Sequence, residues 1–106
     1  MPKVFSVYIL TNRRQTLYIG VTSDLPRRLQ QHLAGAGSAF VRKYHLTRLI
    51  YVETAARAID AIAREKELKG WTRARKMALI ATMNPEWKDL AEEEGWGTYK
   101  SGPSRA

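Results

Sequence analysis

Two tyrosines and two basic side chains near the N-terminus form the first candidate site in the sequence. An arginine presents a planar fork that matches phosphate oxygens, and a histidine titrates near neutral pH. Together they could bind a phosphate group and move a proton, although each of these residues taken alone is more often a packing or solvated residue. The combination predicts a site that cuts phosphodiester bonds, and its residues are Tyr8 in Val7-Tyr8-Ile9, Tyr18 in Leu17-Tyr18-Ile19-Gly20, Arg28 and His32.

A glutamate further along the chain is the candidate ligand for a metal ion. Glu65 falls on the apolar side of the predicted helix 55–69, whereas Asp60 and Glu67 project from the opposite side. A carboxylate that points inward needs a partner, and a hard ion such as Mg²⁺ or Mn²⁺ prefers carboxylate and water. A cation of the chain is an equally good structural partner, and the candidates are Lys69, Arg28 and Arg64.

Hydrophobic periodicity predicts the elements that must position these residues. We expect strands over residues 4–10, 17–21 and 46–54, the first two joined as a hairpin. We expect helices over about 24–34 and 55–69, then between Thr72 and Asn84, and finally over 87–94. Arg28 and His32 are four residues apart on the first helix, so they share one side of it, at the boundary with solvent.

Three strands and about four helices on one core predict an α+β domain, a small sheet with helices covering one side. Residues 1–94 are expected to form this single domain and residues 95–106 a loose tail in which Trp96 and Tyr99 could act as anchors. Strand alternation places Tyr8 and Tyr18 on the open face of the sheet, where Gly20 would leave room for a ligand. The core-facing set is Phe5, Val7, Ile9, Leu17, Ile19 and Val21.

The charge of the chain favours nucleic acid as its partner. The 106 residues carry a net charge of +8, and residues 1–50 hold eight Lys or Arg against one acid. A basic surface attracts polyanions and raises their local concentration, although a solubilising role is as good an explanation on composition alone. The absence of cysteine excludes a zinc finger and a disulfide framework. No apolar run is long enough for a membrane span and no signal peptide is evident, so we expect a cytoplasmic protein.

These motifs resemble those of the GIY-YIG nuclease domain over about residues 4–85. The chain is most similar to a small stand-alone bacterial member of the UPF0213-like type, related to the N-terminal domain of the excision-repair nuclease. The two tyrosine motifs lie about ten residues apart, as in the family. Arg28, His32 and Glu65 match the family's arginine, its His or Tyr position and its metal-binding glutamate, and Asn84 matches its late polar residue. The resemblance also implies a three-stranded antiparallel sheet flanked by helices.

The resemblance implies a metal-dependent endonuclease that hydrolyses DNA, selects its substrate by structure, and serves repair or recombination. A single Mg²⁺ or Mn²⁺ ion on Glu65 would stabilise the leaving oxygen. Tyr8, assisted by Tyr18 and His32, would take a proton from the attacking water, while Arg28 lowers the pKa of the phenol and neutralises charge on the phosphate. The catalytic set is therefore Tyr8, Tyr18, Arg28, His32 and Glu65. Contacts with nucleic acid are expected from Arg13, Arg14, Arg27, Lys69 and Asn84.

Two other classes of function remain open from the sequence. The first is a module that binds DNA or RNA and turns over slowly or never, with DNA favoured over RNA. The second is a protein-interaction domain, and a protein partner or a homodimer is compatible with the small size of the chain. The side chains that would serve protein interaction are Trp71, Trp87 and Trp96.

Overall fold

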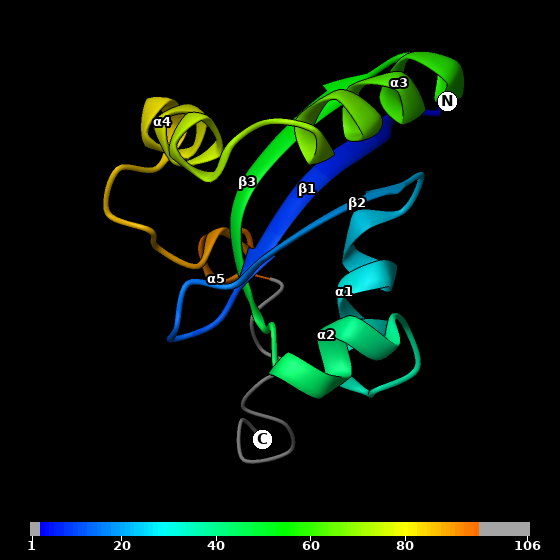
Figure 1. Cartoon of the computed structure of the whole chain (residues 1–106). Helices are drawn as coiled ribbons and strands as arrows, with labels where there is room; N and C mark the ends of the chain where they lie inside the picture. The colour runs from blue at the N-terminus through cyan, green and yellow to red at the C-terminus, as the bar shows by residue number, and fades with distance from the viewer. Residues whose placement is uncertain (1–2, 96–106) are drawn as a thin grey trace.

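The fold is built on a three-stranded antiparallel sheet, as the sequence predicted. The computed structural model describes residues 3–95. Strand β1 (Phe5–Thr11) lies at the centre and pairs with β2 (Leu17–Thr22) on one side and with β3 (Arg48–Ala55) on the other. Figure 1 shows β1 between its two neighbours, with the hairpin that joins β1 to β2 at one end of the sheet. The expected α+β architecture is therefore confirmed.

The described residues form five helices, one more than the sequence predicted. The predicted helices correspond to α1 (Leu25–Leu33), α3 (Ala58–Lys69), α4 (Arg73–Met83) and α5 (Leu90–Glu93). The unpredicted helix is α2 (Ala39–Tyr44), which Ser38 caps by accepting hydrogen bonds from two backbone amides. It escaped prediction because it has six residues and buries only Val41, too little to create a hydrophobic period.

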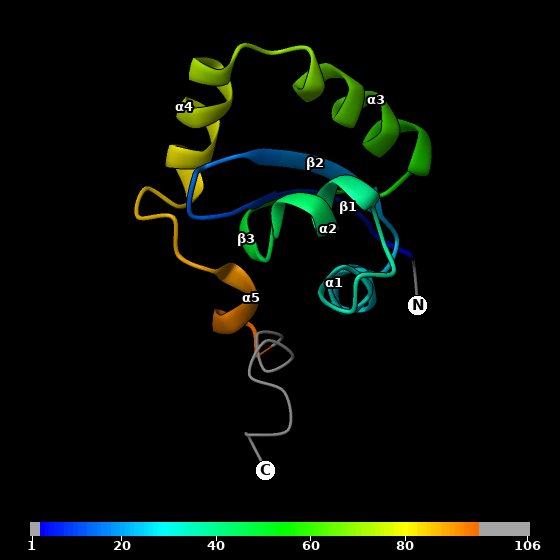
Figure 2. The same cartoon turned by 60° about the horizontal axis from the view of Figure 1, so that its bottom comes forward.

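Helices cover both faces of the sheet, so the prediction of one open face is wrong. Figure 2 shows α3 and α4 on one side of the strands and α1, α2 and α5 on the other. On the α3 face, the strands pack Val7, Ile9 and Ile19 against side chains of α3 and α4. On the α1 face, Tyr8 and Leu10 pack against Leu25, Leu29, Val41 and Ala91. The predicted core-facing set lies on the α3 face, as expected, but it makes only half of the core.

Tyr8 is therefore a core residue rather than an exposed one. Its side chain is 1 % exposed, and its ring lies over Gly20, its cross-strand partner on β2. A Cβ atom on Gly20 would come within 2.5 Å of Tyr8 Cζ and of its hydroxyl oxygen. The sequence correctly indicated a close approach at Gly20, but a phenol ring of the chain itself occupies that space. Because β2 is an edge strand, this brings the hydroxyl of Tyr8 to the edge of the sheet.

Several expectations concern residues at the ends of the chain. Trp96 and Tyr99 lie outside the described residues, and the division into a domain and a tail stays a prediction. Between residues 3 and 95, none of the helices has the length and apolar character needed to cross a membrane.

Substituting Gly20 by alanine should destabilise the fold. The new methyl group would overlap the Tyr8 ring, and the ring cannot move without breaking buried packing, so we expect a loss of about 1 to 3 kcal/mol in the free energy of unfolding. Chemical denaturation of the variant measures this loss. Gly70→Ala is the matched control, since the nearest atom to its added Cβ would be at 3.5 Å, an ordinary contact. Equal stability of both variants would contradict the close approach.

Candidate active site

A buried hydrogen bond between Tyr8 and His32 is the centre of the site. The Tyr8 hydroxyl lies 2.9 Å from His32 Nε2, and it joins the central strand to α1. The sequence starts α1 where this contact needs it, because the Asp24 side chain caps the helix and Pro26 occupies its first turn. His32, predicted at the solvent boundary, is 6 % exposed, since α1 packs its whole inner side on the sheet.

Gly37 packs directly against the His32 ring. A Cβ atom built on Gly37 would collide with His32 Nδ1, so the loop after α1 lies directly against the imidazole. His32 Nδ1 has no hydrogen-bond partner among the described residues, whereas Nε2 bonds to Tyr8. No sequence signal marked Gly37, because the glycine is needed for a close tertiary contact rather than for a turn.

Tyr18 joins these two residues in a cluster of three rings. Its ring centroid is 6.3 Å from that of Tyr8 and 5.7 Å from that of His32, and the latter pair meets edge to face. The centroids of Tyr8 and His32 are 6.0 Å apart. Tyr18 is half-buried, so it is the ring of the cluster that solvent reaches. The structure thus brings together three of the five predicted catalytic residues through direct contacts.

The environment keeps the Tyr8 phenol protonated, because other effects outweigh the expected lowering of its pKa by Arg28. Burial raises the pKa of Tyr8 well above its usual range, and the neighbouring Tyr18 adds to this rise. Arg28 acts in the opposite direction, which places its charge near the phenol, but burial outweighs it. Tyr8 is therefore a neutral hydroxyl at physiological pH, able to pass a proton but not to act as a phenolate base.

His32 is the neutral base of the cluster. Burial lowers the pKa of His32 below its usual value, and the positive charge of Arg28 lowers it further. A neutral imidazole has one free lone pair, and when that lone pair is on Nε2 the Tyr8 hydroxyl donates to it. The 2.9 Å distance between the Tyr8 hydroxyl and His32 Nε2 is then short enough for a proton to pass from Tyr8 to His32.

Glu65 approaches the same site from the other layer of the fold. It lies on α3, which packs on β1 and β2, and its negative charge contributes to the raised pKa of Tyr8. Its side chain is 16 % exposed and pairs with Lys69, with 3.1 Å between Oε2 and Nζ. Of the partners considered for Glu65, Lys69 is the one found, since Arg64 pairs with Glu53 and Glu67.

The donor set around Glu65 fits an ion that keeps most of its water. No cluster of three or more His, Asp or Glu side chains that could hold a metal occurs within residues 3–95. Mg²⁺, however, is commonly bound by one or two carboxylates together with waters and substrate phosphates. Glu65 supplies one such carboxylate, and its partner Lys69 is 54 % exposed and so is free to swing away. A single hydrated ion is therefore compatible with these residues.

The residues predicted to contact nucleic acid fall into two groups. Arg13 and Arg14 lie exposed on the β1–β2 turn, and Arg27 is exposed on α1 near its start. Asn84 differs, because it is buried and its amide is used within the protein. Its Nδ2 donates to the carbonyls of Ile50 and Lys88 at 3.1 and 2.8 Å. Asn84 therefore has a structural role, and its contact with nucleic acid stays a prediction.

A second polar network lies on the α3 face, and the sequence analysis missed it. The Tyr51 hydroxyl donates to Glu53 Oε2 at 2.5 Å, and Arg64 binds both oxygens of Glu53. Burial and the adjacent carboxylate raise the pKa of Tyr51 to about 12. Trp71, which packs against the core here, stacks under Arg75 with 3.9 Å from Cζ to the ring centroid. Trp71 therefore contributes to the packing of the fold, and Trp87 packs against the same core cluster.

The neutral state of His32 makes stability depend on pH. His32 titrates at a lower pH in the folded chain than in the unfolded chain, so unfolding takes up a proton as the pH falls through about 6.5. We expect the free energy of unfolding to be highest above this pH and to decrease toward pH 5. His32→Gln should reduce this decrease, by about 1.4 kcal/mol for each unit of pKa depression.

Denaturation curves at pH 5 to 8 test this expectation. His45→Asn is the matched control, because His45 is exposed and its backbone has a φ of 54°, which asparagine tolerates. This control should retain the wild-type pH dependence. Identical slopes for the wild type and His32→Gln would rule out the buried neutral imidazole.

Comparison with known proteins places the chain in a family. Residues 4–78 match the GIY-YIG catalytic domain. A UPF0213 protein of Natronomonas pharaonis is 36 % identical over 75 residues, which cover 71 % of this chain and 88 % of the relative. A UPF0213 protein of Pseudomonas aeruginosa is 33 % identical over 90 residues, or 85 % of this chain and 86 % of the relative.

A solved structure supports the same assignment. The solution NMR structure of a UPF0213 protein from Bacillus halodurans aligns with a TM-score of 0.55 at 26 % identity, covering 84 % of this chain and 95 % of that one. The names of these relatives state no activity, so the family assignment rests on the matched domain and on the shared fold. The chain belongs to the GIY-YIG nuclease family, as a small stand-alone member similar to the UPF0213 proteins.

Proposed function

We propose that the protein is a metal-dependent endonuclease that hydrolyses phosphodiester bonds in DNA. The observation that carries the proposal is the Tyr8–His32 hydrogen bond of 2.9 Å, with Tyr18 against both rings. The charges of Arg28 and Glu65 both act on the Tyr8 hydroxyl. A neutral base, a proton donor, a cation and a carboxylate are thus combined at one edge of the sheet, which suits hydrolysis of a phosphate diester.

Arg28 is the residue that would bind the scissile phosphate. It is half-buried, and its charge acts on Tyr8 and on His32. A guanidinium in this position can donate two parallel hydrogen bonds to phosphate oxygens. Its fixed positive charge would also stabilise the additional negative charge of the transition state.

The three rings would carry a proton away from the attacking water. Tyr18 is the accessible phenol, so it takes the proton of the water as its own proton passes to Tyr8. Tyr8 in turn gives its proton to Nε2 of His32, and the phenols are neutral before and after the transfer. The products are a hydroxide that forms the new bond to phosphorus and an imidazolium at His32. This relay needs no phenolate, in agreement with the raised pKa of Tyr8.

Glu65 would hold the divalent ion, which we propose to be Mg²⁺ or Mn²⁺. When bound, the ion supplies Lewis-acid stabilisation of charge on the leaving oxygen. Glu65 Oε2 lies 3.1 Å from Lys69 Nζ, and the ion would take the place of this ammonium group beside the carboxylate. Lys69, being exposed, can then turn toward the DNA backbone.

Substrate choice would depend on the structure of the DNA rather than on base sequence. Residues 3–95 form one sheet and the helices that cover it, with no separate reading element such as a helix-turn-helix. A nuclease of this kind fits DNA repair or recombination, where branched or interrupted strands are the substrates. This biological role is part of the proposal.

Binding without turnover is the second candidate. It is favoured by the burial of Tyr8, which is 1 % exposed and therefore has little direct access to water. Salt-sensitive binding of DNA or RNA that leaves the strands intact would support this function.

Cleavage of DNA should depend on Tyr8 and Glu65. We expect the wild type with Mg²⁺ or Mn²⁺ to cut at least one substrate in a panel of supercoiled, nicked, flapped and branched DNA. Tyr8→Phe breaks the proton relay and Glu65→Gln removes the carboxylate charge, so each should slow cleavage by about 100-fold or more. Gel electrophoresis of end-labelled products measures the rates.

Two controls test whether a loss of cleavage is specific to the substituted residues and whether cleavage requires a metal ion. Glu67→Gln is the matched control, since Glu67 is exposed on the same helix and pairs with Arg64. It should cleave within about twofold of the wild type, and addition of EDTA should stop cleavage by both. Wild-type rates in Tyr8→Phe or Glu65→Gln would disprove the mechanism, and absence of any cleavage would favour the binding module.

A further inference from the structure

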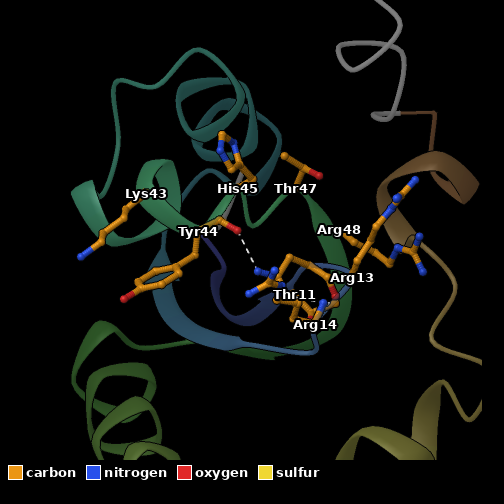
Figure 3. Close-up of a pocket in the computed structure, with 9 residues that line it drawn as sticks. Thr11, Arg13, Arg14, Lys43, Tyr44, His45, Thr47 and Arg48 are labelled. Atoms are coloured by element: carbon orange, nitrogen blue, oxygen red, sulfur yellow. Dashed lines mark hydrogen bonds between the residues drawn. The ribbon is translucent and has the colours of Figure 1, made fainter.

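A basic pocket lies at the end of the sheet that carries the β1–β2 turn. It encloses about 560 Å³ between this turn, the C-terminal end of α2 and the beginning of β3 (Figure 3). Figure 3 shows Arg13, Arg14 and Arg48 on one side of it, with Lys43 and Tyr44 on the other. The residues that line it include four Lys or Arg side chains and no acid.

The turn that presents two of these arginines is fixed in place by Asn12. The Asn12 side-chain oxygen accepts hydrogen bonds from the backbone amides of Arg14 and Thr16, at 2.9 and 3.1 Å. Its nitrogen donates to the carbonyl of Tyr44 at 2.7 Å, which ties the turn to α2 across the pocket. The backbone on both sides of the pocket is therefore preorganised, so a ligand would not have to order it.

Three of the four cations of the pocket form no ion pair with the described residues. The four ion pairs found within residues 3–95 use Arg64, Lys69 and Lys88, and none involves Arg13, Arg14 or Lys43. The surroundings of the fourth cation, Arg48, are different. Its side chain donates to the Trp87 carbonyl at 3.3 Å, and it also borders a second pocket whose lining includes acidic residues of α5. Like charges gathered without counter-charges favour the binding of an anion.

A path of exposed aromatic rings leads from the pocket to the candidate active site. The Tyr44 ring contacts that of Phe40, with 4.7 Å between centroids, and Phe40 stacks on Tyr18 at 6.2 Å. Phe40 and Tyr44 are 42 % and 40 % exposed, so both rings are accessible to the bases of a bound strand. Since a nucleic-acid strand advances about 3.4 Å per nucleotide, a few nucleotides span this path.

We propose that the pocket binds a phosphate group of the nucleic acid at a distance from the scissile phosphate. Arg13 and Arg14 bind the phosphate oxygens, Lys43 adds positive charge from the opposite side of the pocket, and Arg48 lies next to the two turn arginines. The inference rests on the proposed function in that it assumes a nucleic-acid substrate, but it does not require cleavage. The phosphate is either an internal phosphodiester of the bound strand or a terminal phosphate at its end.

Binding measurements test the pocket separately from catalysis. Fluorescence anisotropy of a labelled DNA oligonucleotide in EDTA, over a series of salt concentrations, compares the wild type with Arg13→Gln/Arg14→Gln. We expect the double variant to bind about tenfold or more weakly and its salt slope to decrease by about 1. The turn should remain folded because Asn12 bonds to the backbone of Arg14 rather than to its side chain, and the denaturation midpoint verifies this.

The matched control removes the same charge from elsewhere. Lys3→Gln/Arg57→Gln changes two exposed cations outside the pocket, and its salt slope should remain that of the wild type. Equal losses in the two double variants would overturn the proposal, since they would reflect net charge alone. A pocket-specific loss supports it even if the wild type cuts no DNA, which separates this inference from the proposed function.

The source of the phosphate follows from a second pair of oligonucleotides. Strands with and without a terminal phosphate are compared in the wild type and in Arg13→Gln/Arg14→Gln. A preference for the phosphorylated strand that the double variant loses assigns the pocket to a terminal phosphate. Equal binding of both strands, with the pocket-specific loss retained, assigns it to an internal phosphodiester.

Discussion

The contact between Tyr8 and His32 is the constraint on which the site depends. It links the central strand to the first helix through a buried 2.9 Å hydrogen bond, and two glycines make room for it. Gly20 lets the phenol cross the edge strand, and Gly37 lets the loop after α1 close on the imidazole. Polar groups in a core must be paired, so this bond fixes the distance and orientation between β1 and α1.

Burial of this pair also determines its chemistry. Removal from water raises the pKa of Tyr8 and lowers that of His32, so both groups are neutral near pH 7. Arg28 acts on both residues, yet it does not overcome the effect of burial on Tyr8. A neutral phenol next to a neutral imidazole is suited to passing a proton rather than to holding a negative charge, and this is why the proposed mechanism uses a relay.

The sheet brings together residues that belong to different layers. Tyr8 and His32 are on the α1 face, while Glu65 comes from α3, on the opposite face. The charge of Glu65 affects the pKa of Tyr8 because the Tyr8 ring reaches the β2 edge of the sheet, where α3 also packs. The basic pocket lies further along the same strands, at the β1–β2 turn, and the rings of α2 connect it to Tyr18. The proposed phosphate pocket and the proposed catalytic residues thus lie along one strand pair and its covering helices.

The sequence by itself determined the elements and the types of residue in the site. Strand alternation and helical periodicity identified the strands, four of the helices and the inward position of Glu65, because these patterns repeat within a few residues. Local patterns carry no information on what covers the second face of a sheet, so Tyr8 was predicted to be exposed. The helix α2 was missed because its six residues are too few to create a hydrophobic period. Only the tertiary structure decided that Tyr8 is buried against His32, that Asn84 serves the fold, and that the turn arginines face α2 across a pocket. Each of these depends on contacts between segments distant in the sequence, where packing overrides local preference.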